Sequence, residues 1–179
     1  MYMYFIALVL PDELNKKILP LKQMMLEKWG CKVGLKSPAH ITIIPPFWME
    51  QEKEQQLLKD MDSISHKMMP FSITTNNFSA FKPRTIFIDV EPNNQLNQIK
   101  KETDNFFRNN EAYKIKTENR PFHPHITIAT RDLYKKAFGE AWMIFGVKEF
   151  KETWKAEGLS LLRHNKRNWD VIYTSGFAL

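Results

Sequence analysis

The four residues His40-Ile41-Thr42-Ile43 decide the fold, because the chain uses them a second time as His125-Ile126-Thr127-Ile128. Each copy is a short β-branched run with a proline just upstream, at Pro38 and Pro124, and such a run predicts a strand. Side chains alternate between the two faces of a strand. The isoleucines can therefore face a core, while the histidine and threonine share the opposite face. Two such strands side by side would place two imidazoles and two hydroxyls around one small space, a set suited to acid–base chemistry on a phosphodiester.

The rest of the chain is predicted to form strands and helices, largely in alternation. The apolar start, residues 2–10, predicts a strand, and Pro11-Asp12 predicts the start of a helix. Pro45-Pro46 predicts the end of the first motif strand. Further helices are predicted over residues 50–69, from residues 92–94 onward and over 133–145, and further strands over 71–81, 85–90, 150–162 and 169–174, the last two joined as a hairpin around a basic turn.

The order strand, helix, His-Ile-Thr-Ile occurs over residues 2–43 and again over residues 85–128. Recurrence in a fixed order predicts two related β-α-β units. At 179 residues, the chain is expected to form a single domain over residues 1–179, with two lobes and repeats at 40–43 and 125–128. A pseudo-twofold arrangement of the lobes would bring the two motif strands together.

Composition and charge narrow the class of protein. Apolar residues make up 43% of the chain and charged residues 26%, which are ordinary globular values. The formal net charge of +6 favours an anionic partner. The single cysteine, Cys31, cannot form an internal disulfide and fits a reducing compartment. No stretch approaches the roughly 20 apolar residues of a membrane span, so we expect a cytoplasmic monomer that does not associate with membranes.

Paired His-x-Thr-x motifs, each on a strand near the middle of one half, resemble the signature of the 2H phosphoesterase superfamily. The chain is most similar to the bacterial 2′-5′ RNA ligase-like, or RNA 2′,3′-cyclic phosphodiesterase, branch. The resemblance covers nearly the whole chain, and it includes the opening strand, the stretch Ser37-Pro38-Ala39-His40-Ile41-Thr42, the pair Pro46-Phe47, the strand at 85–90 and the stretch Phe122-His123-Pro124-His125-Ile126-Thr127.

This resemblance implies a bilobal α+β fold with antiparallel sheets lining a central groove. It implies chemistry without a metal or cofactor on 2′,3′-cyclic phosphates or 2′-5′ linkages. It assigns acid–base catalysis to His40 and His125 and phosphate binding to Thr42 and Thr127. Relatives often carry an arginine close after the second motif. Here strand alternation would put Arg131 on the His125 face but further out, as a third phosphate contact.

Opening a cyclic phosphodiester needs a base that takes a proton from water and an acid that protonates the leaving sugar oxygen. Two histidines can share these roles because the ordinary histidine pKa is about 6.5, and the sequence does not decide which is the base. Hydroxyl and guanidinium groups can stabilise the developing negative charge. Phe47 and Phe122 flank the motifs and are candidates for stacking on a base, with packing in the core as the alternative.

Other interpretations of the motifs compete with catalysis. His123, His40 and His125 would suffice as three metal ligands, but Pro124 places His123 before the strand, so we predict no metal site. A single motif would more often be plain sheet, and the pair in matching contexts favours function. The predicted partner is RNA or a nucleotide with a 2′,3′-cyclic phosphate, with the basic turn at residues 163–167 as a candidate contact. Reversible 2′-5′ RNA ligation and a non-catalytic RNA-phosphate-binding module use the same residues and remain open.

Overall fold

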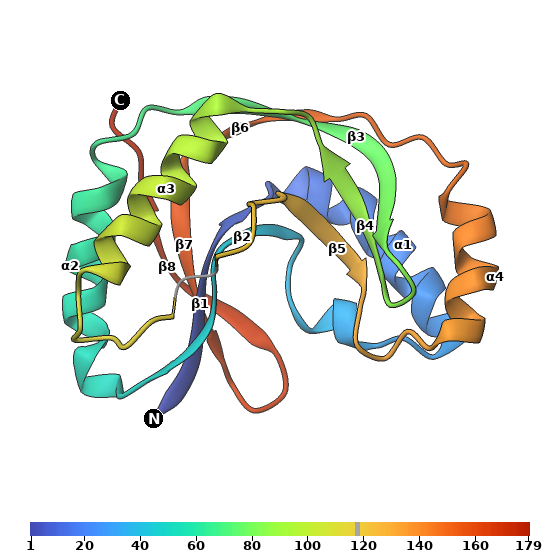
Figure 1. Cartoon of the computed structure of the whole chain (residues 1–179), viewed down its shortest axis with the longest axis horizontal. Helices are drawn as coiled ribbons and strands as arrows, with labels where there is room; N and C mark the ends of the chain where they lie inside the picture. Colours follow the sequence, from blue (N-terminus) through green and yellow to red (C-terminus); the bar gives the residue numbers. More distant parts are fainter. Residues whose placement is uncertain (117–118) are drawn as a thin grey trace.

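The computed structural model describes residues 1–116 and 119–179. Its described strands form one eight-stranded antiparallel sheet in the order β6-β3-β4-β5-β2-β1-β7-β8, curled into a half-barrel (Figure 1). In chain order the elements are β1 (Tyr2–Val9), α1 (Asp12–Trp29), η1 (Val33–Lys36), β2 (His40–Met49), η2 (Gln51–Lys53), α2 (Glu54–Ser65), β3 (Phe71–Phe81), β4 (Thr85–Val90), α3 (Asn94–Arg108), β5 (His125–Ala129), α4 (Lys135–Phe145), β6 (Thr153–Ala156), β7 (Gly158–His164) and β8 (Trp169–Gly176). The α+β fold expected from the sequence is confirmed.

The two motif strands, β2 and β5, are neighbours at the centre of this sheet. Strand β1 flanks β2 and strand β4 flanks β5, so each unit of the repeat contributes one outer and one inner strand. The two units therefore meet along the motif strands, as a pseudo-twofold arrangement requires. They share one continuous antiparallel sheet.

Each unit's helix packs on the motif strand of the other unit. Helix α1 follows β1 in the chain but contacts β5, and α3 follows β4 but contacts β2. Figure 1 shows the result, with α2 and α3 on one side of the molecule and α1 and α4 on the other. Asn93 begins α3 by accepting a hydrogen bond from the Leu96 amide at 3.0 Å, a typical helix cap. The two units are thus interlocked through their helices.

The predicted end of the first motif strand at Pro45-Pro46 is wrong, because β2 continues to Met49. The register between β1 and β2 shifts between Tyr4 and Ile6, whose partners are Phe47 and Ile44. The two prolines therefore lie at an irregularity in the ladder, where their missing N–H groups cost little. The continued strand carries Phe47 into the core, where its ring stacks on Tyr4 with centroids 6.1 Å apart.

The single strand predicted over residues 150–162 is two strands with different partners. Strand β6 pairs with β3 at one edge of the sheet, whereas β7 pairs with β1 and β8 in the other half. Strand β7 begins at Gly158, where a Cβ would lie 2.5 Å from the Ser175 carbonyl oxygen. Only Glu157 separates the two strands in the chain, so no pattern in the sequence indicated the crossing between the two halves.

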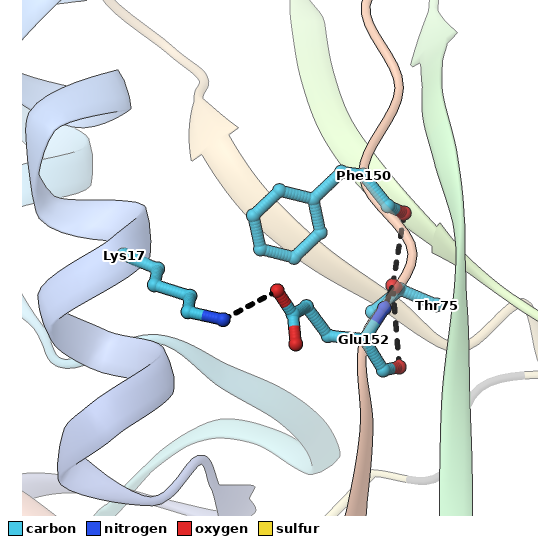
Figure 2. Close-up of polar contacts among 4 residues, drawn as sticks. All are labelled: Lys17, Thr75, Phe150 and Glu152. Atoms are coloured by element: carbon cyan, nitrogen blue, oxygen red, sulfur yellow. Dashed lines mark hydrogen bonds and ion pairs between the residues drawn. The ribbon is translucent and has the colours of Figure 1, made fainter.

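The segment before β6 is tied to two other elements (Figure 2). The buried hydroxyl of Thr75 on β3 donates to the Phe150 carbonyl at 2.9 Å and accepts from the Glu152 amide at 2.8 Å. The Glu152 carboxylate pairs with the ammonium of Lys17 on α1 at 2.7 Å. This segment is therefore held against both the sheet and the helix that covers it.

Among the residues that the structure describes, buried apolar side chains form two separate clusters. The large one lies between the helices and the sheet. The small one is made of Phe5, Ala7 and Leu162, with Val9 and Trp169 packed against it. These five residues come from β1, β7 and β8, beside the motif face of β2. Of the helices that the structure describes, none is both long and apolar enough to span a bilayer.

Candidate active site

A cavity of about 350 Å³ lies along the His-Thr face of the first motif strand. Four residues singled out in the sequence line it: His40, Thr42, Thr127 and Arg131. The other lining residues are Met3, Phe5, Val33, Gly34, Lys36, Ser37, Pro46, Thr130, His164 and Trp169. The cavity thus draws on both motif strands, on η1 and on the β7–β8 hairpin.

The register of β2 against β5 determines which motif side chains are neighbours. Ile41 lies opposite Ile126 in an antiparallel pair. Continuing this register by one residue in each direction puts His40 opposite Thr127 and Thr42 opposite His125. All four side chains share one face because the isoleucines occupy the other. Each histidine therefore lies beside the threonine of the other motif.

Both motif histidines are oriented by the same kind of hydrogen bond. Nδ1 of His40 lies 2.7 Å from the Pro38 carbonyl oxygen, and Nδ1 of His125 lies 2.7 Å from that of His123. A carbonyl oxygen only accepts, so Nδ1 carries the hydrogen in each ring. The neutral ring then has its lone pair on Nε2, which is the nitrogen left to exchange a proton with a substrate.

The surroundings lower the pKa of both histidines. Burial, with smaller effects from the charges of Lys22 and His125, lowers the pKa of His40 to about 4, against the opposing effect of its hydrogen bond to Pro38. Burial also lowers the pKa of His125, while the nearby Asp89 carboxylate acts to raise it. Both rings are therefore neutral at pH 7 in the absence of an anionic ligand.

Arg131 reaches the cavity for a reason other than the one predicted. Strand β5 ends at Ala129, so strand alternation does not extend to residue 131. Arg131 instead has a φ of 65°, a left-handed backbone that is uncommon for residues other than glycine. Such conformations concentrate at functional sites because the surrounding structure must hold them. The guanidinium nevertheless belongs to a residue that lines the same cavity as His40.

The wall formed by η1 is fixed to the end of the second motif. One carboxylate oxygen of Asp132 accepts hydrogen bonds from the Lys32 amide at 2.8 Å and the Val33 amide at 3.0 Å. At Gly34 the backbone comes so close to the Ile128 carbonyl that a Cβ would clash with it. This contact places Lys36 and Ser37 beside the motif strands, a position that no pattern in the sequence predicted.

A row of aromatic side chains lies along the cavity, and the sequence patterns did not predict it. The Phe5 ring lies 4.8 Å from the His40 ring and 4.7 Å from Trp169, and Trp169 lies 4.9 Å from His164, all as centroid distances. The signal for Phe5 is alternation on β1, but Trp169 and His164 join it only through the pairing of β7 with β1 and β8. The row gives the cavity an aromatic side.

The two phenylalanines proposed for stacking on a base lie elsewhere. Phe47 is only 8% exposed and belongs to the large core cluster. Phe122 packs against the same cluster, and its ring faces the ammonium of Lys100 at 5.7 Å. Neither is among the residues that line the cavity. The aromatic residues that do line it are Phe5, Trp169 and His164.

His123, the third histidine considered for metal binding, forms an ion pair or hydrogen bond with Asp89 at 3.1 Å. Asp89 lies on β4 directly opposite His125. Within the described ranges, no group of three or more histidine, cysteine, aspartate or glutamate side chains is close enough to hold a metal ion. The Asp89 carboxylate on β4 thus lies beside the second motif, which is on the neighbouring strand β5.

The sequence is similar to one known protein family and to several named proteins. A family model described as the 2′-5′ RNA ligase superfamily matches residues 10–168. A Geobacillus kaustophilus protein named as a phosphoesterase is 28% identical over 120 residues, 65% of this chain and 65% of that protein. The RNA 2′,3′-cyclic phosphodiesterase of Bacillus subtilis is 24% identical over 136 residues, 72% of this chain and 70% of that protein. Matches to two Bacillus relatives span 53% and 52% of their length, so the chain covers about half to two thirds of most of these proteins.

Solved structures share the whole fold. A crystal structure from Thermus thermophilus has a TM-score of 0.69 at 20% identity, covering 99% of this chain and 98% of that chain. Escherichia coli LigT complexed with 3′-AMP has a TM-score of 0.66 at 17% identity, covering 99% of both chains. At these identities the likeness establishes the fold alone.

Proposed function

The chain belongs to the 2′-5′ RNA ligase superfamily of 2H phosphoesterases, and we propose that it hydrolyses the 2′,3′-cyclic phosphate ends of RNA or nucleotides. The proposed catalysis uses His40 and His125 as acid and base and requires no metal. A relative named RNA 2′,3′-cyclic phosphodiesterase, at 24% identity, supports this substrate class.

The observation that carries the proposal is the crossed register of the two motifs. The pairing of Ile41 with Ile126 sets each imidazole beside a hydroxyl from the other motif strand. Both rings keep Nδ1 engaged by a carbonyl at 2.7 Å, which leaves Nε2 for proton transfer. Two proton-exchanging nitrogens and two hydroxyl donors on one face suit a phosphoryl group held over that face of the two strands.

In the proposed reaction, Nε2 of one neutral histidine removes a proton from a water molecule as the water oxygen attacks phosphorus. A five-coordinate phosphorane forms, and the bond from phosphorus to one ribose oxygen breaks. The other histidine, protonated, gives its Nε2 proton to that leaving oxygen. The hydroxyls of Thr42 and Thr127 donate to the phosphorane oxygens, and Arg131 adds positive charge. The product is a phosphomonoester beside a free ribose hydroxyl.

The aromatic row offers a place for the base of the same nucleotide. Trp169 is partly exposed and lines the cavity together with Phe5 and His164. Stacking on an aromatic side chain contributes about 1–3 kcal/mol per base and tolerates any base. The proposed substrate therefore places its phosphate at the motif strands and its base toward the β7–β8 hairpin.

Turnover of a 2′,3′-cyclic nucleotide in the presence of EDTA tests the proposal. We expect wild-type protein to form a nucleoside monophosphate and His40→Ala protein, shown to be folded by circular dichroism, to lose at least about a hundredfold in kcat. Binding of the nucleotide without turnover would favour a phosphate-binding module. Loss of activity with EDTA would contradict metal-independent catalysis.

A further inference from the structure

Lys22 is a buried cation that the proposed reaction does not use. It lies on α1 and is only 4% exposed. Its ammonium donates to the Ser37 carbonyl at 3.0 Å, and no described carboxylate forms an ion pair with it. Lysine is almost never fully buried without a charged partner, because burial penalises the charged form. Burial accordingly lowers the pKa of Lys22 to about 8, which leaves it mostly charged at neutral pH.

Lys100, in the helix of the second unit, has the charged partner that Lys22 lacks. Lys100 on α3 donates to the Ile43 carbonyl at 2.8 Å and pairs with Asp104, one helical turn later, at 2.7 Å. The residue in the same position relative to Lys22 is Leu26. The charge of Lys100 is therefore compensated within its own helix, whereas that of Lys22 is not.

Lys22 lies beside the segment that precedes the first motif. The Ser37 carbonyl that it holds is one residue before Pro38, whose carbonyl accepts the hydrogen of His40 Nδ1 at 2.7 Å. Ser37 lines the catalytic cavity on one side and, on the other, a second cavity of about 220 Å³ that Lys22 also lines. One short segment thus separates the ammonium from the histidine that this segment orients.

The charged groups around His40 are positive, whereas the charged group beside His125 is negative. The charged and titratable groups around His40 are Lys22 on α1, Lys36 on η1, His125 on β5, Arg131 after β5 and His164 on β7. The described residues that line its cavity include no aspartate or glutamate.

His125 instead lies opposite Asp89 of β4, which also holds His123. His123 and His40 are the other titratable groups near it. A positive neighbourhood disfavours an imidazolium, and a carboxylate favours one.

We propose that Lys22 is a positioning residue that holds the Ser37–Pro38 segment and, through its uncompensated charge, adds to the effect of burial in disfavouring the protonated form of His40. This inference rests on the proposed function for the roles of the two histidines, but the effect of Lys22 on His40 exists without any substrate.

Histidine titration by NMR tests the effect of Lys22 directly. In Lys22→Met protein, the His40 resonance, assigned by its absence in His40→Gln protein, should titrate about one pH unit higher than in wild type, the size expected for one nearby charge at an effective dielectric constant of about 20. The matched control is Lys17→Met, which removes the same charge from the same helix. Lys17 is exposed and pairs with Glu152 before β6 (Figure 2). It should leave the His40 titration unchanged.

Two further variants separate charge from hydrogen bonding. Lys22→Gln keeps a donor but no charge and should shift the His40 titration as Lys22→Met does, whereas Lys22→Arg should preserve the low wild-type value. In kcat/KM for a cyclic nucleotide, the acid limb should move up with the His40 titration, giving up to about a tenfold loss below it. An unchanged His40 titration in folded Lys22→Met and Lys22→Gln proteins would overturn the inference. A shifted titration in a protein without turnover would instead count against the proposed function.

Discussion

At the scale of single residues, the motif histidines and threonines have different tasks on one face. The histidines exchange protons in the proposed reaction, whereas the threonine hydroxyls only donate hydrogen bonds to phosphate. We expect Thr42→Ala and Thr127→Ala each to lower kcat/KM by about tenfold to a hundredfold, the loss expected for one hydrogen bond to a charged group. His40→Ala and His125→Ala should each cost more.

The double histidine variant provides the control for concerted action. Because acid and base act in one transition state, His40→Ala/His125→Ala should be little slower than either single variant. Steady-state turnover of a 2′,3′-cyclic nucleotide by purified, folded variants measures this. If the two single losses multiply in the double variant, the histidines do not act in the same step.

The lowered pKa values predict an acidic optimum for the free enzyme. The reaction needs one neutral and one protonated histidine. As pH rises, kcat/KM should increase through the pKa of His40, about 4, because His40 loses its proton there. It should decrease through the pKa of His125, which lies below the ordinary 6.5, because the acid loses its proton. A pH profile of kcat/KM with both limbs at or above about pH 6.5, the ordinary histidine pKa, would contradict this.

The sequence predicted the motif residues of the site but not the aromatic residues. Alternation along two strands was sufficient to put His40 and Thr42 on one face, because the period of a strand is fixed. Trp169 and His164 are far from both motifs in the chain. They reach the cavity through the register of β7 against β1 and β8, and one sequence does not specify a register between distant strands.

At the scale of elements, local patterns located most strands and helices but misjudged two strand ends. Residues 71–81 and 85–90 were predicted with the bounds that β3 and β4 have. The end of β2 was missed because a β-bulge can accommodate proline. The division between β6 and β7 was missed because only Glu157 separates them and a single sequence does not reveal which strand each of them will pair with.

The contact between η1 and β5 gives a prediction at this scale. In Gly34→Ala protein, the new methyl group would meet the Ile128 carbonyl, which is held in the sheet. We expect a loss of about 1–3 kcal/mol in the free energy of unfolding, as for other overpacked sites, together with weaker nucleotide binding. Urea denaturation and equilibrium binding measure the two effects.

Gly139 in α4 provides the matched control, because a Cβ there meets no atom within 4 Å. Gly139→Ala should raise the free energy of unfolding by about 0.5–1 kcal/mol, since alanine favours a helix over glycine. Equal stability of the two alanine variants would show that η1 can move away from β5 without cost.

At the scale of the whole molecule, the net charge of +6 is relevant to RNA binding. Arg163, one of the predicted contacts, is paired with Glu54 at 2.9 Å, whereas Lys166 and Arg167 at the hairpin tip are exposed. We expect the affinity for RNA that ends in a cyclic phosphate to fall as salt rises, because phosphate contacts release counterions.

The hairpin tip can be tested separately. Lys166→Ala/Arg167→Ala should reduce the slope of log Kd against log salt by up to about two for an oligonucleotide. It should leave the slope for a mononucleotide unchanged, because a single nucleotide occupies only the cavity. Fluorescence anisotropy with both ligands measures this, and an equal change for the two would place the hairpin contact within the cavity itself.

The exchange of helices between the units has a consequence for any attempt to divide the molecule. Strand β5 is covered by α1 and strand β2 by α3, so a fragment cut at the exposed β3–β4 turn would leave one motif strand without its apolar cover. Fragments 1–83 and 84–179 should each aggregate or remain unfolded alone, yet complement one another when refolded together. The chain would then behave like a swapped dimer whose two subunits have been joined, with one reaction centre for each pair of halves and none for either half.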